Sequence, residues 1–236
     1  SVAWIDCLAK GKNLGKSILF RGEHANLIDI KDTPFANTPL FYHNKGMLGV
    51  PFNFPSGSLN SLTIKLFNGF YYMMNKMKGS GITHLDPFFY PLDAIANWNR
   101  IYGKKGFLQY QFVLPLSNSR DGMREVLQAI AVEGRGSFLA VLKLFGKQES
   151  MISFPQEGYT LALDFPIMPG LLKFLTKLDE IVLKHGGRFY FTKDSRLDPD
   201  TFKKGYPRLA EFLEIKKKYD PDGVFSSRQS KRLELT

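Results

Sequence analysis

The order of alternating segments in the second half of the chain constrains the fold most. Stretches with the two-residue period of a strand and amphipathic helices follow one another as strand, helix, strand, strand, helix, strand. The expected strands lie at 107–115, 137–146, 159–165 and 189–191, and the expected helices at 119–133 and 169–187. Helices placed between strands of an open sheet predict an α+β fold of ferredoxin-like type, with a largely antiparallel sheet backed by helices.

The N-terminal part of the chain adds two strands and an unusual loop. SVAWIDCLA at 1–9 alternates as a strand does, and SILFRGE at 17–23 is its expected partner. Residues 31–58 are rich in Pro, Gly and Asn, yet they also contain many aromatic side chains. A polar linker does not need so many aromatic residues, so this segment predicts a packed loop or a hydrophobic flap.

A long helix is expected directly after this loop. Ser58 can cap a helix that runs to about Lys78, in which Leu, Phe and Met recur at helical spacing. Met73, Met74 and Met77 lie toward its end. A Met-rich stripe of this kind fills core space more often than it lines a cofactor, so we expect it to be buried.

The charge balance of the chain favours anionic partners. There are 32 Lys and Arg against 22 Asp and Glu, a formal charge of +10, which attracts phosphates, nucleic acid or an acidic membrane face. The run 216–218 consists of three lysines. We expect it to be a solvated helix face, and no nucleic acid is expected as a partner, because no nucleic-acid-binding motif accompanies the run.

Cysteine and histidine usage narrows the class of protein further. Cys7 is the only cysteine, which excludes an internal disulfide framework and fits a reducing, cytoplasmic compartment. The four histidines lie far apart without the spacing of metal ligands, so no metal site is expected. No apolar window reaches about 18 residues, so no membrane-spanning helix is expected. The chain begins without Met, which suggests a fragment of a longer protein.

Two of the expected strands carry polar side chains among apolar ones. Residues two apart on a strand share a face, so Gln109 and Gln111 lie side by side, either as paired donors and acceptors for a ligand or on a solvated outer face. Lys143 lies on one face with Val141 and Phe145. There it either extends to water or meets an anion such as a phosphate.

The strand YTLALDF has a similar face. Its small and polar residues are Thr160, Ala162 and Asp164. Three neighbouring strands that each present small or polar side chains to one surface predict the floor of a pocket.

Several of these segments together resemble a known family. They are QYQFVLP, SFLAVLKLFG, GYTLALDFP, GGRFYFTKDSR and the tail KKKYDPDGVFSSRQSKRLEL. In this combination they resemble the C-terminal half of the vanillyl-alcohol-oxidase superfamily of FAD-linked oxidases. Within it they are most similar to the polyprenylphosphoryl-ribose oxidases of arabinan precursor synthesis. The resemblance covers most of the chain and is weakest at 31–90.

The resemblance implies two parts and a set of site residues. Residues 1–188 are expected to form the substrate-binding domain, and 189–236 the segment that returns to an FAD-binding domain outside this chain. Tyr190 is implied to lie against the flavin, and Lys193 at its reactive face within reach of substrate. The positions that match the pocket lining are Gln109, Gln111, Leu92, Leu139, Val141, Lys143, Phe145 and Thr160.

The implied activity is FAD-dependent oxidation of a secondary alcohol, the 2′-hydroxyl of a polyprenylphosphoryl ribose, by hydride transfer to flavin N5. Aldonolactone and alditol oxidases share the same tail and remain alternatives. A basic nucleic-acid-binding module would explain the charge but not the polar strand faces. The expected partners are a polyprenyl-phosphate sugar or related polyol, a membrane surface and a keto-reductase. Without the flavin domain, the chain is expected to be inactive.

Overall fold

A six-stranded sheet forms the centre of the protein. The computed structural model describes residues 1–41, 48–55, 57–90, 95–137 and 139–236. The strands of this sheet are β1 (Val2–Ile5), β2 (Ser17–Phe20), β5 (Phe107–Pro115), β6 (Ala140–Phe145), β7 (Gly158–Pro166) and β8 (Arg188–Phe189). They lie in the order β2-β1-β6-β7-β5-β8, and neighbouring strands are antiparallel. The four strands β6-β7-β5-β8 have the ferredoxin-like order, so the α+β prediction is confirmed.

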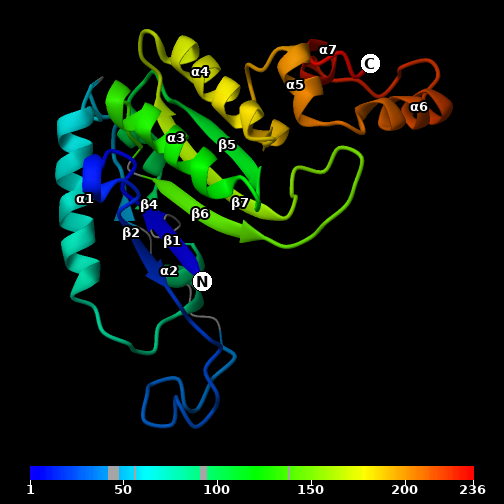
Figure 1. The fold of residues 1–236 in the computed structure, drawn as a ribbon. Coiled ribbons are helices and arrows are strands. Elements are labelled where there is room, and N and C mark those ends of the chain that lie inside the picture. Colours follow the sequence, from blue (N-terminus) through cyan, green and yellow to red (C-terminus); the bar gives the residue numbers. More distant parts are fainter. Residues whose placement is uncertain (42–47, 56, 91–94, 138) are drawn as a thin grey trace.

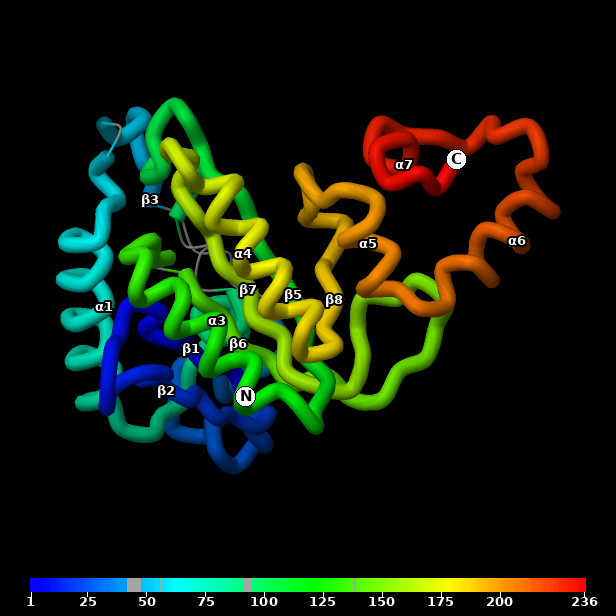
Figure 2. Tube along the Cα trace, turned by 45° about the horizontal axis from the view of Figure 1, so that its top comes forward, coloured from blue at the N-terminus to red at the C-terminus, as the bar shows by residue number. Residues whose placement is uncertain are grey.

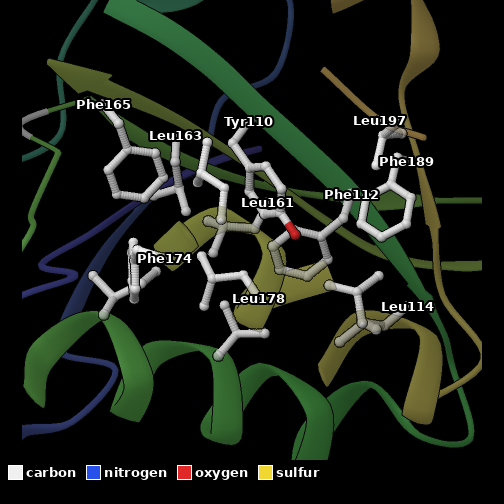
Figure 3. Close-up of a cluster of buried hydrophobic side chains, with 14 of the residues drawn as sticks. Tyr110, Phe112, Leu114, Leu161, Leu163, Phe165, Phe174, Leu178, Phe189 and Leu197 are labelled. Atoms are coloured by element: carbon white, nitrogen blue, oxygen red, sulfur yellow. The ribbon is translucent and has the colours of Figure 1, made fainter. Parts of the chain in front are cut away.

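Two helices cover one face of this sheet. α3 (Ser119–Glu133) and α4 (Leu171–Lys184) lie side by side across the central strands in Figure 1. Each helix directs an apolar stripe toward the sheet, and alternate residues of β5 and β7 point back at it (Figure 3). The buried residues labelled there are Tyr110, Phe112, Leu114, Leu161, Leu163, Phe165, Phe174, Leu178, Phe189 and Leu197.

The turn from α4 into β8 brings the chain close to the central strands. Gly186 has a φ of +72°, which favours glycine, and ends the helix as predicted. A side chain at Gly187 would lie 2.7 Å from the Val113 carbonyl oxygen and from Val182. Glycine at this position therefore lets β8 pair closely with β5 and sets the starting point of the segment that follows.

The predicted long helix is present, but its cap and its orientation differ from the prediction. α1 (Ser61–Lys76) is capped by Asn60, whose side chain accepts hydrogen bonds from the backbone of Leu62 and Thr63, and not by Ser58. Met73 and Met77 are exposed, so the prediction that the Met-rich end packs in the core is wrong. The helix packs against β1 and the turn after it through other residues, among them the buried Ile64.

The described parts of residues 31–58 are held at their C-terminal end. β3 (Leu48–Gly49) pairs in parallel with β4 (Ile95–Ala96), next to the 3₁₀ helix η3 (Trp98–Tyr102). Arg100 donates hydrogen bonds to the carbonyl oxygens of Val50 and Pro51, each 2.8 Å long. The short helix α2 (Leu85–Phe89) follows α1. Many of the large apolar side chains remain exposed: Leu40, Phe41, Leu48, Phe52 and Phe54. A hydrophobic flap describes this segment better than a packed loop.

The C-terminal residues form a helical layer beside the sheet, at the right of Figure 1. Its elements are the 3₁₀ helix η4 (Phe191–Lys193), α5 (Pro199–Gly205), α6 (Leu209–Tyr219) and α7 (Arg228–Arg232). The end of the chain folds back on residues 191–197, because Arg232 forms an ion pair with Asp194 at 2.7 Å. Leu233 is fully buried in the same core cluster as β5 and α4. The run 216–218 lies on α6, with residues 217 and 218 exposed as predicted.

Candidate functional site

The face of the sheet opposite α3 and α4 collects the polar strand residues. Strand register pairs Gln109 with Asp164 and Lys143 with Thr160. Because residues paired across antiparallel strands point to the same side, side chains from β5, β6 and β7 share one surface. The predicted face of polar and small residues is therefore present in the structure, and we refer to it as the floor.

Hydrogen bonds fix part of this floor. The Thr160 hydroxyl is buried and donates to the Phe112 carbonyl oxygen at 2.8 Å. It also accepts a hydrogen bond of 3.1 Å from the Gln111 side-chain nitrogen. The Gln111 nitrogen is thus directed into the sheet, which leaves its side-chain oxygen as the acceptor available to a ligand.

Asp164 is the buried acid of this surface. Its carboxylate lies 3.5 Å from the hydroxyl of Tyr102, a residue of η3, and also interacts with the Gln109 side chain. Burial raises the pKa of Asp164 to about 6, although the hydrogen bond from Gln109, the charge of Lys193 and the hydrogen bond from Tyr102 act in the opposite direction. A carboxyl group with this pKa can exchange a proton near neutral pH.

Lys193 enters the same surface from the C-terminal segment. Its ammonium group lies 5.9 Å from the centre of the Tyr190 ring. Burial lowers the pKa of Lys193, nearby Asp164 raises it, and the charge of Lys143 lowers it further. The net pKa is below the ordinary value of a lysine, so the group gives up its proton more readily than a solvated lysine.

Tyr190 is held in place by its backbone and its ring. Its amide donates to the Gln111 carbonyl oxygen at 2.9 Å, and its own carbonyl accepts from the Lys193 amide at 2.9 Å. The ring stacks on Phe154 at 4.6 Å, and Phe154 meets Phe145 edge to face at 5.8 Å. Three aromatic rings therefore link the end of β6 to the segment that carries Lys193.

The pKa of Asp164 leads to a stability prediction. Its folded pKa of about 6 exceeds the ordinary value of 3.8, so the unfolded chain releases this proton first and stability falls as pH rises between these values. Asp164→Asn removes the buried charge. It should stabilise the fold by up to about 3 kcal/mol above pH 6 and have little effect at pH 4, as measured by urea unfolding.

The matched control for this experiment is the exposed Asp222, where Asp222→Asn should have no effect at either pH. A loss of stability in Asp164→Asn at pH 7.5 would contradict the prediction. It would mean that the attraction between Asp164 and Lys193 outweighs the cost of burying the carboxylate.

The structure brings together most of the residues predicted to form the site. Eight of them lie on β5, β6, β7 or the segment after β8: Gln109, Gln111, Val141, Lys143, Phe145, Thr160, Tyr190 and Lys193. Leu139 is partly buried and lies just before β6. Leu92 lies outside the described residues. A small hollow, open to solvent, lies between β5 and residues 189–197 and reaches Gln109, Gln111 and Tyr190. Among the residues that the structure describes, there is no cluster of three or more His, Cys, Asp or Glu side chains that could bind a metal ion.

Comparison with known proteins shows which proteins the chain is similar to. A family model described as D-arabinono-1,4-lactone oxidase matches residues 161–233. Over its whole length, the chain is 39% identical to the decaprenylphosphoryl-beta-D-ribose oxidase of Mycolicibacterium smegmatis and covers 51% of that protein. The resemblance to the FAD-linked oxidases is confirmed.

Two other relatives share parts of the chain. An uncharacterized Streptomyces coelicolor protein is 37% identical over 117 residues, which are 49% of this chain and 32% of that protein. The probable L-gulonolactone oxidase 6 of Arabidopsis thaliana is 27% identical over 170 residues, 65% of this chain and 27% of that protein. The chain thus spans about half of the Mycolicibacterium protein and about a third or less of the other two.

The groups on this surface are suited to proton transfer and to the stabilisation of charge. The surface combines a partly desolvated lysine, a buried acid and two amide side chains. Such groups can hydrogen-bond a hydroxyl, move its proton and stabilise negative charge that develops nearby.

Two residues of this surface were missed as site residues. Asp164 was predicted on the pocket floor, but not as a functional group. The signal was available, since an acid in the strand YTLALDF, otherwise rich in apolar residues, requires a partner. Tyr102 contacts it from 62 residues away in sequence, and no local pattern predicts that contact.

Proposed function

We propose that this chain is the substrate-binding and C-terminal part of an FAD-dependent oxidase that oxidises the 2′-hydroxyl of a polyprenylphosphoryl ribose. The observation that carries the proposal is the surface that holds Lys193, Asp164 and Tyr190 together, in a chain 39% identical to a decaprenylphosphoryl-beta-D-ribose oxidase. When bound, FAD would supply the acceptor for the hydride that leaves the alcohol carbon.

The groups on this surface fit such a cofactor. Lys193 offers a cation, and Tyr190 offers an aromatic ring already fixed by Phe154. A cation and an aromatic ring suit a planar, electron-accepting ring system. Residues 189–236 would carry these two side chains into an FAD-binding domain formed by other residues of the complete protein, while residues 1–188 bind the substrate.

The remaining residues of the surface suit a sugar phosphate. Gln109 and the side-chain oxygen of Gln111 can hydrogen-bond sugar hydroxyls. Lys143 is exposed beside them and would bind the phosphate, in line with the formal charge of +10. The flap at 31–58 would shelter the polyprenyl chain. Oxidation of the 2′-hydroxyl would give a ketone, and a separate keto-reductase would then reduce this ketone.

A specific observation favours a second candidate function, the oxidation of an aldonolactone or alditol. The family model that matches residues 161–233 is described as a D-arabinono-1,4-lactone oxidase, and one relative is a probable L-gulonolactone oxidase. An oxidase of water-soluble aldonolactones or alditols would use the same Lys193 surface. It would require neither a phosphate partner for Lys143 nor an apolar flap.

The test is the anaerobic reduction of the complete, flavin-loaded protein by substrate. The loss of flavin absorbance measures this reduction. Polyprenylphosphoryl ribose should bleach the flavin, whereas free ribose, alditols and aldonolactones should do so at least about 100-fold less efficiently, because they lack the binding energy of phosphate and lipid. Bleaching by an aldonolactone alone would favour the second candidate. A purified complete protein that binds no flavin would contradict both.

A further inference from the structure

Helix α1 exposes an apolar stripe to solvent, while its inward side carries Ile64, Asn68 and Tyr71. Four apolar residues of the helix and Met77, its C-cap residue, follow one another at intervals of three or four and form a single stripe: Leu62, Leu66, Phe70, Met73 and Met77. Each of them is 57% exposed or more. Soluble helices normally turn such a stripe toward their own core, so this one is placed to meet something outside the described fold.

The opposite side of α1 is fixed to the protein by polar contacts. Asn68 is fully buried and donates a hydrogen bond of 2.7 Å to Asp6, which Lys16 also approaches at 3.6 Å. Tyr71 packs its ring on Trp4 at 4.9 Å. A buried hydrogen bond to a charged partner is costly to break, so α1 does not simply rotate to bury its stripe. Figure 1 and Figure 2 both show α1 at the margin of the molecule.

The charge around the stripe has one sign. Between Asp32 and Asp86 the sequence contains no Asp or Glu, and its four charged residues are all lysines. Lys65 and Lys76 each lie three residues after a stripe residue and so border one edge of the stripe, and Lys78 lies two residues beyond the end of the helix. The part of the flap after Asp32, with exposed Leu40, Leu48 and Phe52, belongs to the same stretch without acidic residues.

An apolar stripe in a segment whose charged residues are all lysines matches a lipid surface with anionic headgroups. A helix of this kind lies in the plane of the interface, with its apolar side among the acyl chains and its lysines at the phosphates. A second copy of the chain fits less well, because each copy carries a formal charge of +10 and brings the same lysines to the contact. No helix among the described residues has the length and apolarity to cross a bilayer.

We infer that the outer side of α1 is a membrane-docking surface that binds vesicles containing anionic phospholipid. The choice of a lipid partner rests on the proposed function, in which the substrate itself is a lipid phosphate. Docking through α1 and the flap would hold the site near the bilayer, so that the sugar phosphate reaches Lys143 while its polyprenyl chain stays in an apolar environment.

The test uses the complete, flavin-loaded protein and co-sedimentation with vesicles of phosphatidylcholine, with and without phosphatidylglycerol. The protein should bind the anionic vesicles and release them at high salt. The double variant Leu66→Glu/Phe70→Glu should weaken binding about 100-fold, because two apolar side chains are replaced by anions. Both positions are exposed, so the fold should persist, which circular dichroism checks.

The matched control is Val132→Glu/Leu172→Glu, which makes the same change at exposed apolar positions of α3 and α4. This control should bind vesicles as the parent protein does. Equal loss in both double variants, or no binding by the parent, would overturn the inference. The inference would also be overturned if the parent protein were a dimer and only the variant Leu66→Glu/Phe70→Glu were a monomer. That result would mean that the stripe binds a second copy of the chain.

The docking surface and the proposed function can fail separately. Flavin bleaching by detergent-solubilised substrate without vesicle binding would reject the docking surface and leave the oxidase proposal standing. Vesicle binding that depends on Leu66 and Phe70, in a protein whose flavin no substrate bleaches, would reject the oxidase proposal and support docking.

Discussion

Replacing Lys193 with methionine is expected to slow substrate-dependent flavin reduction about 10²- to 10³-fold in the complete, flavin-loaded protein. Methionine keeps much of the apolar stem but removes both the charge and the exchangeable proton. Lys193 is the group on the surface that combines a lowered pKa with a position beside Asp164 and Tyr190. Stopped-flow absorbance under anaerobic conditions measures the rate constant directly. An unchanged rate constant would remove Lys193 from the chemistry.

A second substitution separates the two roles that Lys193 can have. Lys193→Arg keeps the positive charge, but a guanidinium does not release its proton near neutral pH. If Lys193 acts only through its charge, the arginine variant should recover most of the rate. If it exchanges the hydroxyl proton, this variant should stay slow, and the parent rate should rise with pH toward the lowered pKa of Lys193. Lys204→Ala, an exposed lysine of α5, is the control that should behave as the parent.

The elements that sequence patterns predict well here are those whose periodicity and end signals agree. β5 and α3 match their predicted residues, because FLQYQFVLP alternates cleanly and SRDGMREVLQAIAVE ends at a glycine. α1 shows what periodicity cannot decide. Its apolar stripe was read as a core face, but the buried Asn68 and its bond to Asp6 hold the other side inward. A stripe predicts a helix and an apolar contact, not which molecule makes the contact.

The candidate site was predictable to the extent that strand alternation assigns faces. Gln109, Gln111, Lys143 and Thr160 share a surface because each occupies the predicted side of its strand. The environment of Asp164 was not predictable, because it depends on Tyr102 and Lys193, which arrive from distant segments. The alternatives for Gln111 were a ligand contact or a solvated face. The structure shows that its nitrogen is already bonded to Thr160, which neither alternative included.

The segment that carries Lys193 depends on a buried ion pair between α4 and residue 196. Asp179 is buried and accepts hydrogen bonds from Arg196 at 2.7 Å and from the Tyr110 hydroxyl at 3.0 Å. The Arg196 guanidinium also lies over the Tyr110 ring, 5.6 Å from its centre. Because Arg196 is only three residues after Lys193, these contacts restrain the backbone that positions Lys193 over the sheet.

Asp179→Ala is therefore expected to destabilise the fold by about 3–5 kcal/mol, because it leaves the guanidinium of Arg196, whose side chain is only 15% exposed, without its partner. For a domain of this size, the melting temperature should fall by about 6–20 °C in a thermal unfolding experiment. The double variant Asp179→Leu/Arg196→Met replaces the pair with apolar side chains and should recover most of the stability. A loss below about 1 kcal/mol in Asp179→Ala would show that water solvates Arg196. In that case the pair of Asp194 with Arg232, and not α4, holds Lys193 over the sheet.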